Sequence, residues 1–310
     1  MMGTTYPSVQ LPPDSGRQLF VQVSPILQKA DIAAGNLEGA MCDDGQTAKR
    51  LSKSSYAFRM PTFLAPRLKE AGFDFLSMAN NHANDFGTEG ILSTMHSLDR
   101  LGIRYAGVKG RSEQAIIEKN GVKYGFCAFG HNAYTLRHQD LLTVRRVITR
   151  LVNVCDIVIV SFHGGAEGLS HRRLPYGREL FYQEDRGTLR NFAHFCIDAG
   201  ADVVYGHGPH VVRAIELYKG HFIAYSLGNF CTPYGMSLSG ALAYAPILEL
   251  SVTRDGRFQH GKIHSFIQRR GIGPRVDSRK RVVREIRCLT RLDVPNSSLL
   301  ISEDGFIRRK

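Results

Sequence analysis

The sequence has no pair of cysteines spaced as Cys-x-x-Cys, although it contains six cysteines in 310 residues. Zinc sites held by thiolates and structural disulfide frameworks need cysteines at close, regular spacings, so neither is expected. Several cysteines lie within apolar runs, as Cys127 does between Phe126 and Ala128, and this pattern predicts buried free thiols. Free thiols favour a reducing compartment, which places the chain as written in the cytoplasm.

Long apolar runs are also missing from the sequence. No stretch reaches 18 apolar residues, and the first twenty residues contain no charged segment followed by an apolar one. The sequence therefore predicts neither a membrane span nor a signal peptide. An upstream extension that carries a signal or an anchor is the alternative, and it would associate the protein with the cell envelope.

Motifs of several common enzyme classes do not occur. The sequence has no Gly-x-x-x-x-Gly-Lys-Ser/Thr phosphate loop and no Gly-x-Ser-x-Gly turn for a serine nucleophile. No cysteine lies in the charged, helix-starting context that lowers the pKa of a thiol. Nucleotide hydrolysis by a phosphate loop and hydrolysis through a serine or cysteine nucleophile are therefore not expected.

The formal net charge of the chain is +12, because Lys and Arg outnumber Asp and Glu. The chain is 43% apolar, which predicts a large folded core. Anionic polymers and phosphoesters are suitable partners for such a chain. Twelve of the Lys and Arg residues, against five acids, lie between Gln268 and Lys310. No aromatic residues alternate with these charges to stack on bases, so we expect a solvated basic tail and no nucleic-acid partner.

Short β-branched runs alternate with amphipathic stretches along the chain. The runs predict strands over residues 122–129, 156–162, 202–205, 222–227 and 246–252. Apolar spacing near 3.6 residues predicts helices over residues 61–71, 88–101, 141–154 and 178–199. A turn at 254–257 then leads into 258–268, which predicts an antiparallel hairpin with 247–252. We expect one α/β domain over residues 1–270 and a basic tail over residues 271–310.

Residues that commonly bind metals come directly after four predicted strands. These strands cover residues 31–34, 73–79, 157–162 and 201–205, and the polar residues after them are Asn36 with Glu38, Asn81 with His82, His163 with Glu167, and His207 with His210. In α/β sheets, ligands bind at the carboxyl ends of the strands. Mixed oxygen and nitrogen donors suit divalent ions of the Mn, Zn or Fe kind, so the pattern predicts a metal centre.

A site with two divalent metal ions lowers the pKa of a bridging water and holds the oxygens of a phosphoryl group. A histidine that is not itself a ligand can then protonate the leaving group. We select His82 for this role.

These motifs resemble those of the capsule-biosynthesis and poly-γ-glutamate synthesis (CapA-like) family. The resemblance covers most of residues 20–252 and rests on five segments in order: 36–38, 80–87, 163–167, 206–210 and 225–230. It implies a calcineurin-like metallophosphatase fold, a four-layer α/β/β/α sandwich with a two-metal site. It also implies metal ligands at Glu38, Asn81, His163, His207 and His210, with Asn36 near the bridging position, His82 as general acid and Glu167 close to the site.

Several assignments within the motifs stay open. The family usually has His-x-His in its fourth motif, whereas this chain has His207 and His210, and we favour His210 over His207 as the ligand. Glu167 either touches substrate or a ligating histidine, or holds its own loop through backbone N–H groups. Asp85 is expected to be a turn or helix-start residue. Asn229 packs a strand end or forms a wall of the site.

The start of the chain departs from the family pattern. The family opens with an apolar strand that ends in Gly-Asp, and its Asp is a metal ligand; residues 1–7 resemble the segment immediately after that strand. We therefore expect a fold that lacks its first strand and one metal ligand, and we infer as a hypothesis that the chain begins too late.

Two functions are compatible with these observations. The first is a metal-dependent, phosphoesterase-like hydrolase of capsule or poly-γ-glutamate synthesis that acts on an anionic polymer or a phosphoester. The second is a non-catalytic accessory protein with an incomplete metal site, which binds a polyanion or an assembly partner through the same fold.

Overall fold

The computed structural model describes residues 1–49 and 56–310. Its largest sheet has six strands in the order β12-β13-β11-β8-β7-β6. The four inner strands are parallel and the two edge strands are antiparallel to their neighbours. In chain order the strands are β6 (Gln114–Lys119), β7 (Val122–Phe129), β8 (Ile157–His163), β11 (Val203–His207), β12 (Ile215–Tyr218) and β13 (His221–Ala224).

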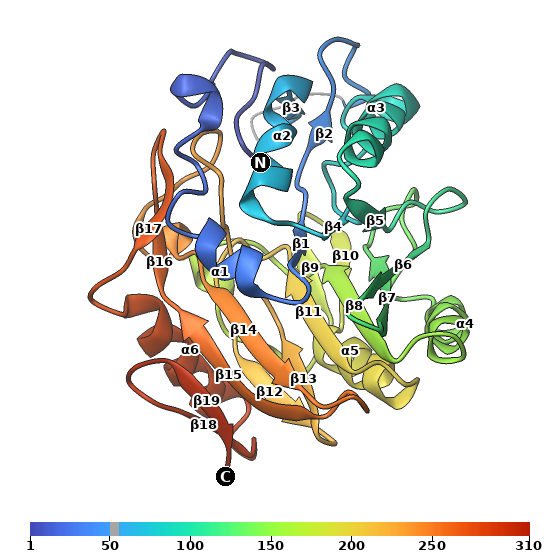
Figure 1. Ribbon diagram of the computed structural model, residues 1–310, viewed down its shortest axis with the longest axis vertical. Helices are drawn as coiled ribbons and strands as arrows, with labels where there is room; N and C mark the ends of the chain where they lie inside the picture. The colour runs from blue at the N-terminus through green and yellow to red at the C-terminus, as the bar shows by residue number, and fades with distance from the viewer. Residues whose placement is uncertain (50–55) are drawn as a thin grey trace.

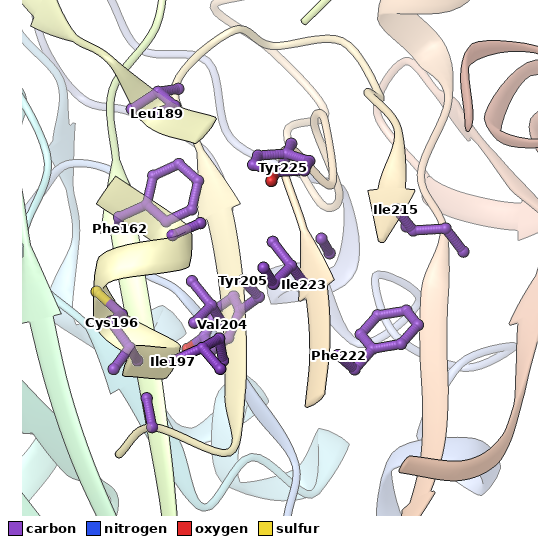
Figure 2. Close-up of a cluster of buried hydrophobic side chains, with 14 of the residues drawn as sticks. Phe162, Leu189, Cys196, Ile197, Val204, Tyr205, Ile215, Phe222, Ile223 and Tyr225 are labelled. Atoms are coloured by element: carbon purple, nitrogen blue, oxygen red, sulfur yellow. The ribbon is translucent and has the colours of Figure 1, made fainter. Parts of the chain in front are cut away.

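Helices α4 (Leu141–Val152) and α5 (Leu189–Asp198) cover one face of this sheet. Helix α4 begins after Asp140, whose carboxylate accepts a hydrogen bond from the backbone N–H of Thr143 at 3.1 Å. Its buried residues recur at helical spacing and pack with α5 on β7, β8 and β11. Figure 2 shows part of this core, in which Phe162 of β8 faces Leu189 and Cys196 of α5.

A second sheet packs on the opposite face. It consists of the parallel strands β1 (Ala34–Asn36), β4 (Phe75–Ser77) and β5 (Arg104–Ala106) in the order β1-β4-β5. The rings of Phe75 and Phe126 stack between the two sheets with centroids 4.3 Å apart, and both side chains are fully buried.

Three helices pack on the outer face of this second sheet: α1 (Ser24–Lys29), α2 (Pro66–Ala71) and α3 (Gly87–Arg100). The order of layers is therefore helix, sheet, sheet, helix, as Figure 1 shows, which confirms the expected four-layer α/β/β/α fold. The short parallel pair β2 (Ala40–Met41) and β3 (Arg59–Met60) extends this end of the molecule.

The segment after residue 270, expected as a solvated tail, is folded. Strand β16 (Phe266–Arg269) pairs with β17 (Gly273–Val276), so the expected boundary falls inside a hairpin. Helix α6 (Arg281–Asp293) buries Val282, Ile286 and Leu289 in the same hydrophobic cluster as β11 and β12. A four-stranded sheet completes this region, with β14 (Ile247–Val252), β15 (Phe258–His264), β19 (Phe306–Arg309) and β18 (Leu299–Ile301) in that order.

The expected helix over residues 178–199 is correct only in its second half, where α5 lies. Residues 179–187 form an antiparallel hairpin instead, β9 (Glu179–Phe181) and β10 (Glu184–Gly187). Tyr182 and Gln183 form its turn with φ of 47° and 66°, the left-handed conformation that a two-residue hairpin turn requires. The buried side chain of Glu179 also pairs with Arg213, a distant partner that local spacing does not reveal.

The cysteines are free thiols, as predicted, although Cys288 is exposed and Cys155 is half-buried. Burial raises the pKa of the Cys231 thiol to about 12. No helix within residues 1–49 and 56–310 is long and apolar enough to cross a membrane.

The contact between the two sheets provides a test of the fold. Phe75→Ala removes one of the two stacked rings and leaves a cavity between the sheets, so we expect the free energy of unfolding to fall by about 3–5 kcal/mol. Urea unfolding at pH 7 measures the change. Phe63→Ala, at a side chain that is 49% exposed, is the control and should change the free energy by less than about 1 kcal/mol. Equal effects of the two substitutions would contradict this packing.

Candidate metal centre

The predicted site residues lie at the carboxyl ends of β1, β4, β8 and β11. His163 is the last residue of β8, His207 is the last residue of β11, and the two are opposite each other in register. Because the strands are parallel, the loops after them meet at one edge of the sheets. We call Asn36, Glu38, Asn81, His82, His163, His207 and His210 the strand-end cluster.

Glu38 lies at the centre of this cluster. Its Oε1 is 3.2 Å from His163 Nε2, and its Oε2 accepts a hydrogen bond from Asn36 Nδ2 at 2.7 Å. Burial alone would raise the pKa of Glu38, but His163, with further contributions from His210 and His82, holds it well below its ordinary value. The carboxylate therefore stays ionised and available as a ligand.

Asn36 lies within β1 and not after it, because the strand covers residues 34–36 and not the predicted 31–34. Its orientation is set by Asn80, whose Nδ2 donates to Asn36 Oδ1 at 3.1 Å and to the carbonyl of Leu37 at 2.8 Å. The predicted site did not include Asn80, although it belongs to the Asn-Asn-His motif. It connects the loop after β4 to the loop after β1.

His82 is held by Asp85, which was expected to be only a turn residue. His82 Nδ1 lies 2.8 Å from Asp85 Oδ2, and Lys49 Nζ lies 2.5 Å from Asp85 Oδ1. Asp85 also accepts the backbone N–H of Phe58 and is fully buried. A carboxylate at Nδ1 orients the imidazole, and Lys49 Nζ also lies 3.2 Å from His82 Nδ1. The spacing of three residues between His82 and Asp85 was the available signal, whereas nothing local indicated Lys49.

His210 is fixed by Asn229, which forms a wall of the site. Asn229 Oδ1 lies 3.0 Å from His210 Nδ1, and its Nδ2 donates to the carbonyl of His210 at 3.2 Å. A proton on Nδ1 leaves the lone pair of Nε2 free to bind a ligand. The Nε2 atom of His207 has no hydrogen-bond partner among the described residues, and burial lowers the pKa of His207 to about 4. Both histidines therefore offer an unprotonated nitrogen to the cluster.

Two buried arginines, absent from the sequence predictions, hold the loop after β8. Arg186 Nη1 donates to Glu167 Oε1 at 2.9 Å, while Glu167 Oε2 is 3.8 Å from His210 Nε2. Arg213 makes two hydrogen bonds to Glu179, which in turn accepts the backbone N–H of Ala166. Glu167 thus lies beside His210 and is held by the side chain of Arg186.

The donor atoms fit a divalent metal in their chemistry. The buried atoms Asn81 Oδ1, His163 Nδ1 and His207 Nε2 have no hydrogen-bond partner among the described residues, and such atoms are costly unless something satisfies them. The described residues contain no group of three or more His, Cys, Asp or Glu side chains spaced to hold a metal ion. Glu38 and His163 instead bond to each other.

The four layers form a calcineurin-like α/β fold, and polar side chains lie at the ends of its strands. The chain belongs to the family of bacterial capsule synthesis proteins described as PGA_cap, whose family model matches residues 1–234. The resemblance stated from the motifs is confirmed.

Proteins similar to this chain occur in several bacteria. The capsule biosynthesis protein CapA of Bacillus anthracis is 30% identical over 237 residues, covering 70% of this chain and 54% of that protein. A probable polyglutamine synthesis accessory protein of Mycobacterium tuberculosis is 28% identical, covering 66% of this chain and 56% of that protein. The chain thus spans about half the length of these curated relatives. A phosphatase structure from Mycoplasma pneumoniae has a TM-score of 0.43 at 16% identity, covering 72% of each chain.

The low pKa of His207 predicts how stability depends on pH. The unfolded chain binds a proton at this histidine below about pH 6.5, whereas the folded chain stays unprotonated there until about pH 4. His207 therefore does not reduce the free energy of unfolding above about pH 6.5. As the pH falls from 6.5 toward 4, the unfolded chain gains a proton that the folded chain does not, and the free energy of unfolding falls. Relative to His207→Asn, the wild type should lose about 1–2 kcal/mol of unfolding free energy between pH 7 and pH 5.

Urea unfolding at both pH values, in the presence of a metal chelator, measures this difference. His260→Asn, at an exposed histidine of β15, is the control and should show the pH dependence of the wild type. A His207→Asn variant with an unchanged pH dependence would show that burial does not disfavour the charge of this imidazole.

Proposed function

We propose that this chain is a metal-dependent phosphoester hydrolase that acts in the synthesis of a capsule or of poly-γ-glutamate. The observation that carries the proposal is the strand-end cluster, which joins the ionised carboxylate of Glu38 to His163 and also holds buried amide and imidazole atoms without hydrogen-bond partners among the described residues. Buried polar atoms without partners are rare in native proteins and mark places where a ligand completes the structure. The family membership supports the biological setting.

Glu38, Asn81, His163, His207 and His210 are the proposed metal ligands, with Asn36 beside Glu38. These residues would hold a pair of divalent ions, which would supply a water of lowered pKa and charge stabilisation for a phosphoryl group. Asn36 bonds to Glu38 and so fixes the direction of the carboxylate. Asn229 keeps the proton of His210 on Nδ1, which directs Nε2 toward the cluster.

His82 is the proposed proton donor to the leaving group. Its bond to Asp85 engages Nδ1 and leaves Nε2 to exchange a proton with substrate. Asp85 fixes the direction of the imidazole, and Lys49 Nζ lies beside both Asp85 Oδ1 and His82 Nδ1. Asp85 and Lys49 are therefore positioning residues for His82. Glu167, held by Arg186 beside His210, borders the place where substrate binds.

An anionic substrate suits the charge of the chain. The formal net charge of +12 attracts phosphate groups and acidic polymers over distances of about a Debye length. The named relatives are proteins of capsule, PGA or polyglutamine synthesis. We extend this setting to the chain as a proposal, with an anionic polymer or a phosphoester linked to its synthesis as the substrate class.

A non-catalytic accessory role is the second candidate. It is favoured by the direct bond between Glu38 and His163 and by the lack of three ligand side chains at metal spacing among the described residues. In this case the strand-end cluster binds no metal, and the positively charged surface of the chain binds the polyanion. The mycobacterial relative is named an accessory protein, which agrees with this role.

Metal content tests the first proposal. We expect purified protein loaded with Mn²⁺ or Zn²⁺ and then desalted to retain about two ions per chain, as a two-metal site requires, measured by plasma mass spectrometry. His163→Ala should lose at least half of the bound metal because it removes a central ligand. His260→Ala controls for adventitious binding to an exposed histidine. A folded wild-type chain without retained metal would contradict the hydrolase proposal and favour the accessory role.

Turnover tests the role of His82. With bis(p-nitrophenyl) phosphate as substrate, His82→Asn should lower kcat by about 10²- to 10⁴-fold and leave the metal content unchanged. Asp85→Asn should lower kcat less, because the imidazole of His82 loses the carboxylate that orients it. A metal-loaded wild-type chain with no turnover, but with salt-sensitive binding to poly-γ-glutamate, would select the accessory role.

A further inference from the structure

The outer face of helix α4 combines arginine with exposed leucine. The side of the helix that packs on the six-stranded sheet carries its four buried residues, Val144, Val147, Ile148 and Leu151. The opposite side lies in solvent, at the right-hand edge of the molecule in Figure 1. We call its exposed residues the α4 outer face: Leu141, Leu142, Arg145, Arg146 and Arg150.

The arginines of this region outnumber the acids around them. Residues 137–154 contain four arginines and one acid, Asp140, whose carboxylate accepts the backbone N–H of Thr143. None of the four arginines forms an ion pair with a carboxylate in the described part of the chain. The guanidinium carbon of Arg145 lies 5.0 Å from the ring centroid of Phe195, which positions the charge without neutralising it.

Helix α6 is the other basic helix, and its charge is better balanced. Two of its arginines form ion pairs, Arg281 with Asp277 and Arg287 with Glu303. Helix α4, by contrast, has three arginines and no acid within its bounds. Its outer face therefore has uncompensated positive charge.

Leu142 projects into solvent between these charges. It is the most exposed large apolar side chain in the described part of the chain, at 83%. Leu141 beside it is also exposed, as are Val152 and Val154 at the other end of the helix. Transfer of such side chains from water to an apolar medium is favourable. The α4 outer face thus offers apolar contact and positive charge at the same place.

We propose that the α4 outer face binds the surface of an anionic phospholipid bilayer. Such a surface presents negatively charged headgroups above an apolar layer, which is complementary to arginines that surround a projecting leucine. The arginines pair with lipid phosphates, and Leu142 enters the apolar layer beneath them. Helix α4 then lies in the plane of the interface, as basic helices with apolar side chains do. This attachment depends neither on a metal nor on turnover.

A dissolved anionic polymer is the competing partner, because it also pairs with arginine. It has no apolar layer, so it would leave Leu141 and Leu142 in water. Its binding would therefore not change the surroundings of residue 142 from water to hydrocarbon. A bilayer accounts for the charge and for the exposed leucines together.

Tryptophan fluorescence tests the proposal, because the chain contains no tryptophan of its own. Leu142→Trp places one indole on the α4 outer face, and Leu180→Trp, at a leucine of β9 that is 54% exposed, is the matched control. The probe is vesicles of equimolar phosphatidylglycerol and phosphatidylcholine. We expect the emission of Leu142→Trp to shift to shorter wavelength and to be quenched by brominated acyl chains, because the indole leaves water. Leu180→Trp should show neither effect, and vesicles of phosphatidylcholine alone should affect neither variant.

Charge reversal tests the arginines. The double variant Arg145→Glu/Arg146→Glu should cosediment with the anionic vesicles at least about tenfold more weakly than the wild type, because each arginine near an anionic surface contributes to binding. Arg308→Glu/Arg309→Glu makes the same change of charge at exposed residues of β19 and should bind as the wild type does. Urea unfolding checks that each variant is folded.

Several results would overturn the proposal. They are no binding of the wild type to the anionic vesicles, equal losses in the two double variants, and binding without quenching at residue 142. Binding to dissolved poly-γ-glutamate that Arg145→Glu/Arg146→Glu abolishes, with no binding to vesicles, would assign the face to an anionic polymer and would also overturn it.

Discussion

The face-to-face packing of two sheets whose central strands are parallel is the constraint on which the rest of the structure depends. The stacked rings of Phe75 and Phe126 fix the position of β4 over β7. Because β7 pairs with β8 and β8 pairs with β11, the positions of β8 and β11 relative to β4 are fixed as well. Because all these strands run in one direction, the loops after them meet at one edge. Glu38 from one sheet can therefore contact His163 from the other, although 125 residues separate them in the sequence.

This edge concentrates charge and unpaired polar atoms in a buried place. Burial disfavours the protonated form of His207 and His210, whereas the neighbouring imidazoles favour the ionised form of Glu38. The arrangement keeps a carboxylate charged and nitrogens unprotonated at the same point, which is the state that metal ligands require. Outside the cluster, Asp85, Asn229 and Arg186 orient His82, His210 and Glu167, so the geometry of the cluster depends on side chains that are not themselves proposed ligands.

The sequence by itself determined the α/β class, most strands of the large sheet, and the positions of the polar residues after them, because alternation and helical spacing are local patterns. It placed α3 and α4 within two residues of their ends, and the motifs identified the family. Tertiary structure alone decided the rest. Residues 179–187 became a hairpin because Glu179 pairs with distant Arg213, and residues 281–309 became core because α6 buries its apolar face on β12. The position of Lys49 beside Asp85 could not be predicted, because it depends on which distant segment lies next to the Asn-Asn-His motif, and no local pattern in the sequence identifies that segment.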